Sequence, residues 1–168
     1  TIPVSVNVSR IDIYDPRIEE IIDGLVHEYG LTPAELHLEI TESAYSENAE
    51  QLIQVVENFR KKGYLIEMDD FGAGYSSLNM LANLPIDVLK LDMKFIQDIH
   101  TDEKCLRMVQ LIMDIARFLD VPVVAEGVEV EEQCRLLKEM GCELIQGYYF
   151  SKPVPAEEFE KFITGGTK

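Results

Sequence analysis

Short apolar runs alternate along this chain with longer segments in which apolar residues recur every three or four positions. The short runs predict six β-strands, over residues 2–8, 36–40, 64–68, 88–91, 121–125 and 143–146. The periodic segments predict helices over residues 18–29, 52–59, 106–116, 131–140 and 157–162. Thr101 is a candidate N-cap for the third helix, and Gly63 and Gly141 are candidate stops for the second and fourth.

Strands that alternate with helices in this way are typical of a parallel sheet built from βαβ units. Two architectures fit this pattern, an open doubly wound sheet and a (β/α)₈ barrel. An open nucleotide-binding sheet is expected to carry a glycine-rich loop after its first strand, but here that strand runs into Asn7-Val8-Ser9-Arg10. We therefore expect an α/β fold of the TIM type, a (β/α) barrel with about six of its eight strands present.

The size and composition of the chain fit one such domain over residues 1–168. With 168 residues and 46% hydrophobic content, the chain can bury one substantial core. The formal net charge of -16 argues against polymeric nucleic acid as a partner, because phosphate binding needs clustered Lys and Arg. No apolar run is long enough to insert into a membrane, and the three cysteines form no CxxC pair, so we expect a cytoplasmic protein.

Polar or charged residues stand at the end of each predicted strand, inside or just after an apolar run. They are Asn7, Glu39, Glu42, Asp69, Asp70, Lys90, Asp92, Glu126, Glu129 and Gln146. Any one of them could be a helix cap, a turn residue or a satisfied core carboxylate. Because six consecutive strands share the feature, and the strand ends of a barrel converge on one face, we expect these side chains to meet in one pocket. Carboxylates that lie so close together need cations between them.

The candidate ligands are carboxylates and one Asn amide, with no His or Cys at a predicted strand end. Such hard oxygen ligands favour Mg²⁺, Mn²⁺ or Ca²⁺ over Zn²⁺ or copper. The adjacent pair Asp69-Asp70 could serve two ions, which suits in-line attack on a phosphodiester. Lys90 could orient or deprotonate a water, or neutralise developing charge. The histidines are expected in helices or loops as structural or exposed residues, and they are His27, His37 and His100.

Six motifs follow one another along the chain. They are Asn7-Val8-Ser9, Leu38-Glu39-Ile40-Thr41-Glu42-Ser43, Asp69-Asp70-Phe71-Gly72-Ala73-Gly74-Tyr75-Ser76-Ser77-Leu78, Lys90-Leu91-Asp92, Ala125-Glu126-Gly127-Val128-Glu129 and Gln146-Gly147-Tyr148-Tyr149-Phe150-Ser151-Lys152-Pro153. Each motif alone is moderately specific. Their order and spacing, from the first residue to about Pro155, together resemble the EAL domain family.

The resemblance implies a phosphodiesterase that hydrolyses the bacterial second messenger cyclic di-GMP to linear pGpG with Mg²⁺ or Mn²⁺, whereas Ca²⁺ would bind and inhibit. By motif, the implied metal ligands are Asn7, Glu39, Asp69, Asp70 and Glu126. Glu126 also resembles the family's contact to the attacking water, Lys90 the lysine that holds or activates this water, and Gln146 a further polar contact. The implied substrate or loop supports are Arg10, Glu42, Asp92, Glu129 and Pro153, and Glu42 would steady the loop after Asp70 that the family links to dimerisation.

The chain departs from the family pattern at its N-terminal end. The tripeptide Glu-Ala-Leu, whose glutamate is a metal ligand in the family, does not occur, and Ala34-Glu35-Leu36 resembles it only superficially. We therefore expect a barrel without its first strands, with weaker metal binding, poor hydrolysis and exposed edges that promote self-association. Ala73 also stands where the family commonly has threonine, which is a mild change.

The resemblance further implies a homodimer and a longer parent protein, with an upstream sensor or GGDEF-type domain and a possible membrane anchor in upstream segments. Two alternatives to the enzyme stay open. One is a receptor or regulatory module that binds cyclic di-GMP without cleaving it. The other is an unrelated metal-dependent barrel enzyme of the enolase or aldolase kind, which would need a different motif set. Because every ligand position in the six motifs is filled, the motifs favour the enzyme.

Overall fold

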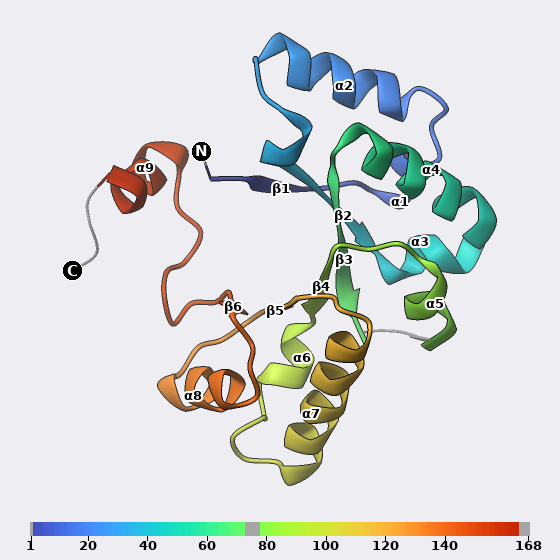
Figure 1. The fold of residues 1–168 in the computed structure, drawn as a ribbon. Coiled ribbons are helices and arrows are strands. Elements are labelled where there is room, and N and C mark those ends of the chain that lie inside the picture. Colours follow the sequence, from blue (N-terminus) through green and yellow to red (C-terminus); the bar gives the residue numbers. More distant parts are fainter. Residues whose placement is uncertain (1, 73–77, 165–168) are drawn as a thin grey trace.

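The structure of the protein, a computed structural model, describes residues 2–72 and 78–164. Its sheet is a curled half-barrel of parallel strands with helices on its outer side (Figure 1). The strands pair in chain order and are β1 (Val4–Asn7), β2 (Leu36–Thr41), β3 (Leu65–Phe71), β4 (Val88–Leu91), β5 (Val123–Ala125) and β6 (Leu144–Ile145). The barrel-type α/β fold expected from the sequence is confirmed, and all six expected strands are present.

The helices fall into a long set and a short set. The long ones, all five expected from the sequence, are α2 (Ile18–Glu28), α4 (Ala49–Lys62), α7 (Glu103–Phe118), α8 (Glu131–Glu139) and α9 (Ala156–Thr164). The short ones are α1 (Arg10–Ile13), the 3₁₀ turn η1 (Pro33–Glu35), α3 (Glu42–Glu47), α5 (Leu78–Asn83) and α6 (Met93–Ile96). The short helices were not predicted, because one or two turns are too few for a helical repeat of apolar residues to show.

Two expectations about individual residues were wrong. Thr101 does not cap α7, because the side chain of the next residue, Asp102, accepts the backbone N–H of Lys104 at 2.8 Å. His37 lies in β2 rather than in a helix or loop, and its Nδ1 is 2.7 Å from Glu67 Oε1. The expected stop at Gly63 is confirmed, since this residue ends α4 with a φ of 98° that suits glycine.

The core lies between the sheet and its outer helices. Side chains alternate between the two faces of a strand, so Leu38 and Ile40 of β2 pack outward, where they are fully buried. Leu52 and Phe59 of α4 belong to the same apolar cluster. The intervening strand residues, such as Glu39, therefore face the inside of the half-barrel, which leaves that face for polar side chains.

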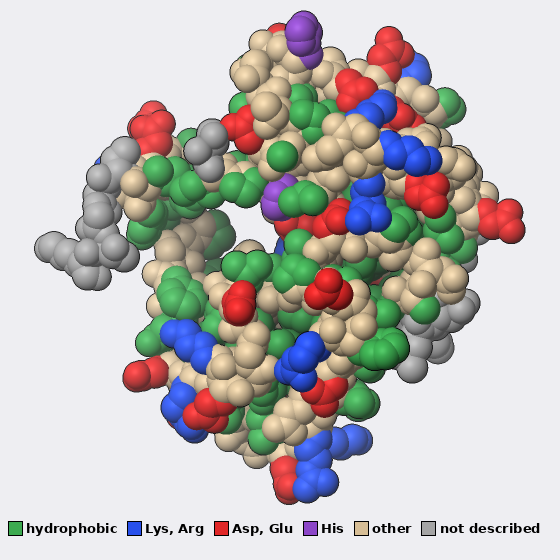
Figure 2. Space-filling view, viewed as in Figure 1, with side chains coloured by type: hydrophobic (Ala, Val, Ile, Leu, Met, Phe, Trp, Pro, Cys, Tyr) green, Lys and Arg blue, Asp and Glu red, His purple; other side chains and the backbone are tan. Residues whose placement is uncertain are grey.

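The sheet has two free edges within the part of the chain that the structure describes. There β1 pairs with β2 alone and β6 with β5 alone, so the barrel does not close. Val4 of β1 is 57% exposed, and the segment that carries α9 stands away from the body of the molecule across an open gap (Figure 2). Among the described helices none is long and apolar enough to cross a membrane.

Candidate active site at the carboxyl ends of the strands

The ammonium group of Lys90 is the centre of a buried cluster of charges. Lys90 is 5% exposed, and its Nζ lies 2.7 Å from Glu39 Oε1, 2.8 Å from Glu126 Oε1 and 3.2 Å from Asp69 Oδ1. The four groups come from β2, β3, β4 and the residue after β5. Three carboxylates thus share one cation, and the cluster keeps a formal excess of two negative charges when all four groups are ionised.

The register of the parallel strands produces this convergence. Asn7 pairs with Glu39 across β1 and β2, and Thr41 pairs with Asp69 across β2 and β3. The chain continues this order after β5, because the backbone N–H of Glu126 donates to Leu91 O at 3.2 Å. The sequence-based expectation that acids from successive strands meet is thus met for Glu39, Asp69 and Glu126, and Asn7 lies in register beside them.

A bulge in β3 sets the direction of the adjacent carboxylates Asp69 and Asp70. Met68 pairs with Leu89 and Phe71 with Leu91, so β3 contains one more residue than β4 over this stretch. Asp70 has a φ of 56°, in the left-handed region that Asp tolerates better than most residues. In a regular strand two neighbours point to opposite faces, whereas a bulge can re-aim one of them toward the same edge of the sheet.

The pKa values of the cluster reflect burial and crowding of like charges. Asp70 lies at the exposed side of the cluster, where partial desolvation raises its pKa and the neighbouring carboxylates of Asp69 and Asp92 raise it further. Burial likewise raises the pKa of Glu126, against the opposing effect of Lys90. Burial by itself lowers the pKa of Lys90, but its hydrogen bonds with Glu126 and Glu39 outweigh this effect and raise the pKa overall. Lys90 is therefore a firmly protonated counter-ion in this arrangement.

Two further acids expected at the site are buried beside it. Asp92, 5% exposed, caps α6, because its Oδ1 accepts the backbone N–H of Lys94 at 2.8 Å. Glu42 is buried at the first position of α3. The loop that Glu42 was expected to steady, with Ala73 in it, lies outside the described residues, so that role and its link to dimerisation stay predictions.

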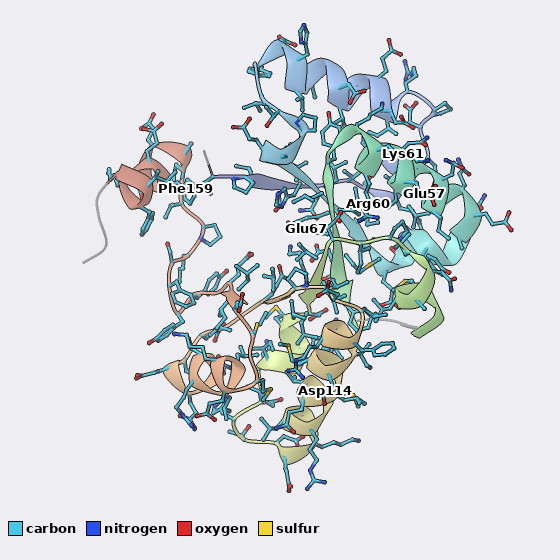
Figure 3. All side chains as sticks on the ribbon, in the orientation of Figure 1. Glu57, Arg60, Lys61, Glu67, Asp114 and Phe159 are labelled. Carbon is cyan, nitrogen blue, oxygen red and sulfur yellow. The ribbon has the colours of Figure 1, made fainter. Side chains whose placement is uncertain are left out.

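The remaining expected residues lie farther out. Arg10 begins α1 with an exposed side chain, and Glu129 is exposed while its backbone N–H donates to Gln133 Oε1 at 2.8 Å. Gln146 and Pro153 are exposed and line a groove of about 530 Å³ whose far wall includes Phe159 of α9 (Figure 3). The ion pairs of Lys90 go to Glu39, Asp69 and Glu126, so the roles of these four residues stay predictions.

One buried acid was not singled out from the sequence. Glu67 of β3 is 6% exposed and its Oε1 accepts Ser5 Oγ at 3.0 Å, in addition to its contact with His37. The signal was present, because Glu67 stands two residues before Asp69 inside an apolar run and must face the same side of the sheet. The predicted site residues stand at the ends of strands, whereas Glu67 lies inside its strand.

The carboxylate oxygens of the cluster are suitable ligands for a divalent metal ion. Asp69 Oδ1 is buried and has no hydrogen-bond partner among the described residues, although Lys90 Nζ is within ion-pair distance at 3.2 Å. A buried oxygen in this state is costly unless a cation or another donor satisfies it. Carboxylate oxygens are hard ligands of the kind that Mg²⁺ and Mn²⁺ prefer. Among the described residues no three acidic, His or Cys side chains already enclose a position for an ion, since Lys90 Nζ occupies the middle of the cluster.

The fold and the site together define a parallel (β/α) barrel-type domain with an acidic centre at its strand ends. The profile of the EAL domain family matches residues 1–153, and the chain belongs to this family. It is 39% identical to the cyclic di-GMP phosphodiesterase NbdA of Pseudomonas aeruginosa over 160 residues, which are 95% of this chain and 20% of NbdA. The chain thus spans about a fifth of the length of this relative.

Solved structures of the family share the fold. The PaMucR phosphodiesterase in complex with c-di-GMP matches with a TM-score of 0.89 and 34% identity, over 94% of this chain and 64% of that one. The manganese and cy-diGMP complex of BlrP1 from Klebsiella pneumoniae matches with a TM-score of 0.84 and 31% identity, over 90% of this chain and 39% of that one.

Proposed function

We propose that the protein to which these residues belong is a metal-dependent phosphodiesterase that hydrolyses cyclic di-GMP to linear pGpG. The observation that carries the proposal is the convergence of Glu39, Asp69 and Glu126 on Lys90, with a buried Asp69 oxygen to which no described residue donates a hydrogen bond. The names of NbdA and PaMucR, and the manganese and cy-diGMP in the BlrP1 structure, support the choice of substrate and of cofactor class.

In this proposal the metal ligands are Asn7, Glu39, Asp69, Asp70 and Glu126. Bound Mg²⁺ or Mn²⁺ would supply the positive charge that activates water and neutralises the phosphodiester. Ca²⁺, which prefers a larger and more flexible ligand shell, is expected to bind and to inhibit. Water attacks phosphorus and releases a proton, one P–O bond to a ribose breaks, and the released ribose oxygen takes up a proton, so that one water is consumed in each cleavage.

The proposed role of Lys90 is that of a charged, water-orienting group. A lysine whose pKa is raised by carboxylate partners keeps its proton near neutral pH, so Lys90 serves to orient water and to neutralise charge rather than to remove a proton. In this proposal Glu126, which contacts Lys90 Nζ at 2.8 Å, also holds the attacking water. Gln146 supplies a further polar contact, and the supporting residues are Arg10, Glu42, Asp92, Glu129 and Pro153.

The test is to incubate the 168-residue chain, and the longer protein that contains it, with cyclic di-GMP and Mn²⁺ and to measure pGpG. The 168 residues contain no Glu-Ala-Leu tripeptide, so we expect them alone to hydrolyse cyclic di-GMP more slowly than a family member that has it.

Glu126→Ala in the longer protein should lower turnover at least about 100-fold, and Glu57→Gln on the outer helix α4 is the matched control. Unchanged turnover in Glu126→Ala would defeat the role assigned to Glu126, and binding without any pGpG would identify a receptor instead.

We also propose that the chain forms a homodimer through the outer side of α7. Met108, Leu111 and Phe118 are exposed there, at 41%, 55% and 87%, on the side opposite the buried residues of this helix. A shallow groove of about 480 Å³ runs along this side and includes Met108 and Leu111. Within one copy Arg107 pairs with Glu103 and Asp114 with Arg117. When two copies pack antiparallel about a two-fold axis near Leu111, Arg107 of each copy also faces Asp114 of the other, so these charges are complementary across the interface.

We also propose a cellular compartment and a domain context for the protein. The cysteines Cys105, Cys134 and Cys142 are all free, which suits the reducing cytoplasm. Because the chain spans only a fifth of NbdA, we propose that a sensor or GGDEF-type domain precedes it in a longer protein.

A further inference from the structure

Beneath the Lys90 cluster lies a second polar group, formed by Ser5, His37 and Glu67. Ser5 of β1 and His37 of β2 pair in register, and both donate to the same oxygen, Glu67 Oε1, at 3.0 and 2.7 Å. The Glu67 side chain is 7% exposed and that of His37 is 14% exposed. An ionised carboxylate has only acceptor sites, so the proton of each contact lies on Ser5 Oγ and on His37 Nδ1.

The strand register connects this group with the proposed metal site. Glu67 pairs with Glu39 across β3 and β2, where neighbouring strands are about 4.8 Å apart, and the two side chains share the inner face. Ser5 lies two residues before Asn7 on β1, and His37 lies two residues before Glu39 on β2. Both donors therefore hold the Glu67 carboxylate from the side nearer the amino ends of the strands. Glu39 Oε1 meanwhile contacts Lys90 Nζ on the opposite side, at 2.7 Å.

We propose that Glu67 is a positioning residue of the metal site that acts through Glu39. The inference rests on the proposed function, in which Glu39 is a metal ligand. Because Ser5 and His37 fix the Glu67 carboxylate, its repulsion of Glu39 turns the Glu39 carboxylate toward Lys90 and the carboxyl ends of the strands.

The experiment is a titration of the 168-residue chain with Mn²⁺, in which the electron paramagnetic resonance signal reports the free ion. Glu67→Gln keeps the shape of the side chain and removes its charge, and it should weaken Mn²⁺ binding by about tenfold or more, as outer-shell changes at metal sites do. Glu57→Gln removes the same charge from the outside of α4, away from the inner face where Glu67 lies (Figure 3), and should change Mn²⁺ affinity less than twofold. Ser5→Ala should act in the same direction as Glu67→Gln by a smaller factor, and it replaces that variant if Glu67→Gln does not fold.

A double-mutant cycle separates this inference from the proposed function. Glu39→Gln should weaken Mn²⁺ binding, and adding Glu67→Gln to it should then change the affinity less than twofold, because the residue through which Glu67 acts has been neutralised. If Glu39→Gln leaves Mn²⁺ affinity unchanged, the proposed metal site itself is wrong. If Glu39→Gln weakens binding but Glu67→Gln matches Glu57→Gln, or lowers only the metal-free melting temperature, Glu67 is a structural residue and the inference is overturned. Additive effects of the two substitutions would also overturn it, since Glu67 would then act without Glu39.

Discussion

Lys90 Nζ lies 3.2 Å from Asp69 Oδ1, yet this oxygen is buried and accepts no hydrogen bond from residues 2–72 or 78–164. The shorter contacts of the ammonium go to Glu39 and Glu126, at 2.7 and 2.8 Å, so Asp69 receives charge compensation without a directed bond. The same lysine thus holds the acids together and leaves one of their oxygens available. This relationship explains how a cluster with excess negative charge can be stable and still accept a further cation.

Lys90→Met should therefore destabilise the metal-free protein by about 3–5 kcal/mol, the usual cost of leaving buried charge without its partner. Mn²⁺ should restore part of the lost stability, because it replaces the missing positive charge and binds the folded state selectively. Thermal unfolding of both proteins with and without Mn²⁺ measures this. The expectation fails if Lys90→Met is as stable as the parent chain without metal, or if Mn²⁺ raises the two melting temperatures equally.

The sheet and the convergence of the acidic side chains could be predicted from the sequence, because both follow from the regular alternation of strand and helix patterns. Strands of a parallel barrel end on one face, so Glu39, Asp69 and Glu126 converge whatever the details of their loops. The bulge at Asp70 could not be predicted in this way, since it depends on how β3 and β4 align, which no periodic pattern records.

His37 and Glu67 show a second limit of what a sequence pattern can predict. Each is a polar residue within an apolar run, and the period of two places Glu67 on the inner face. Their contact at 2.7 Å depends on the pairing of β2 with β3, which brings together residues 30 positions apart in the chain. A pattern along one strand says which face a residue occupies, but it does not say which partner it meets there.

Gly147→Ala should destabilise the protein by about 1–3 kcal/mol, the usual cost of overpacking. A Cβ at Gly147 would overlap the backbone O and N of Val128, and backbone atoms cannot move aside as a flexible side chain can. Gly24→Ala is the matched control, because nothing lies within 4 Å of its added Cβ in the middle of α2. That variant should gain about 0.5–1 kcal/mol from better helix propensity. Urea unfolding measures both, and equal effects of the two substitutions would contradict the close approach at Gly147.

Stability should fall at acid pH partly through the contacts of Lys62 with Glu19 and Asp23, at 2.8 and 2.7 Å. Hydrogen bonds from Lys62 and Asn58 lower the pKa of Glu19 below its ordinary value of 4.5. A carboxyl with a lowered pKa in the folded state stabilises the protein above its unfolded pKa, and this contribution is lost as pH falls through the folded pKa. The difference in unfolding free energy between the parent chain and Lys62→Met should therefore shrink as pH falls below 4.5. A difference that stays constant from pH 6 to pH 3, within about 0.3 kcal/mol, would rule out this linkage.

If the chain dimerises through α7 as proposed, both apolar and charge substitutions on this helix should weaken the dimer. Leu111→Glu should convert a dimer into a monomer, because it buries an unpaired carboxylate at the two-fold axis. Arg107→Asp and Asp114→Arg should each weaken the dimer, since each variant faces a like charge on the second copy, and the double variant should restore it. Sedimentation equilibrium over a range of concentrations gives the dissociation constant of each protein. Ile11→Glu, at an 81% exposed apolar position on α1, is the control that changes exposed apolar surface away from α7. A parent chain that is monomeric at all concentrations, or a double variant no tighter than the single ones, would contradict the antiparallel arrangement.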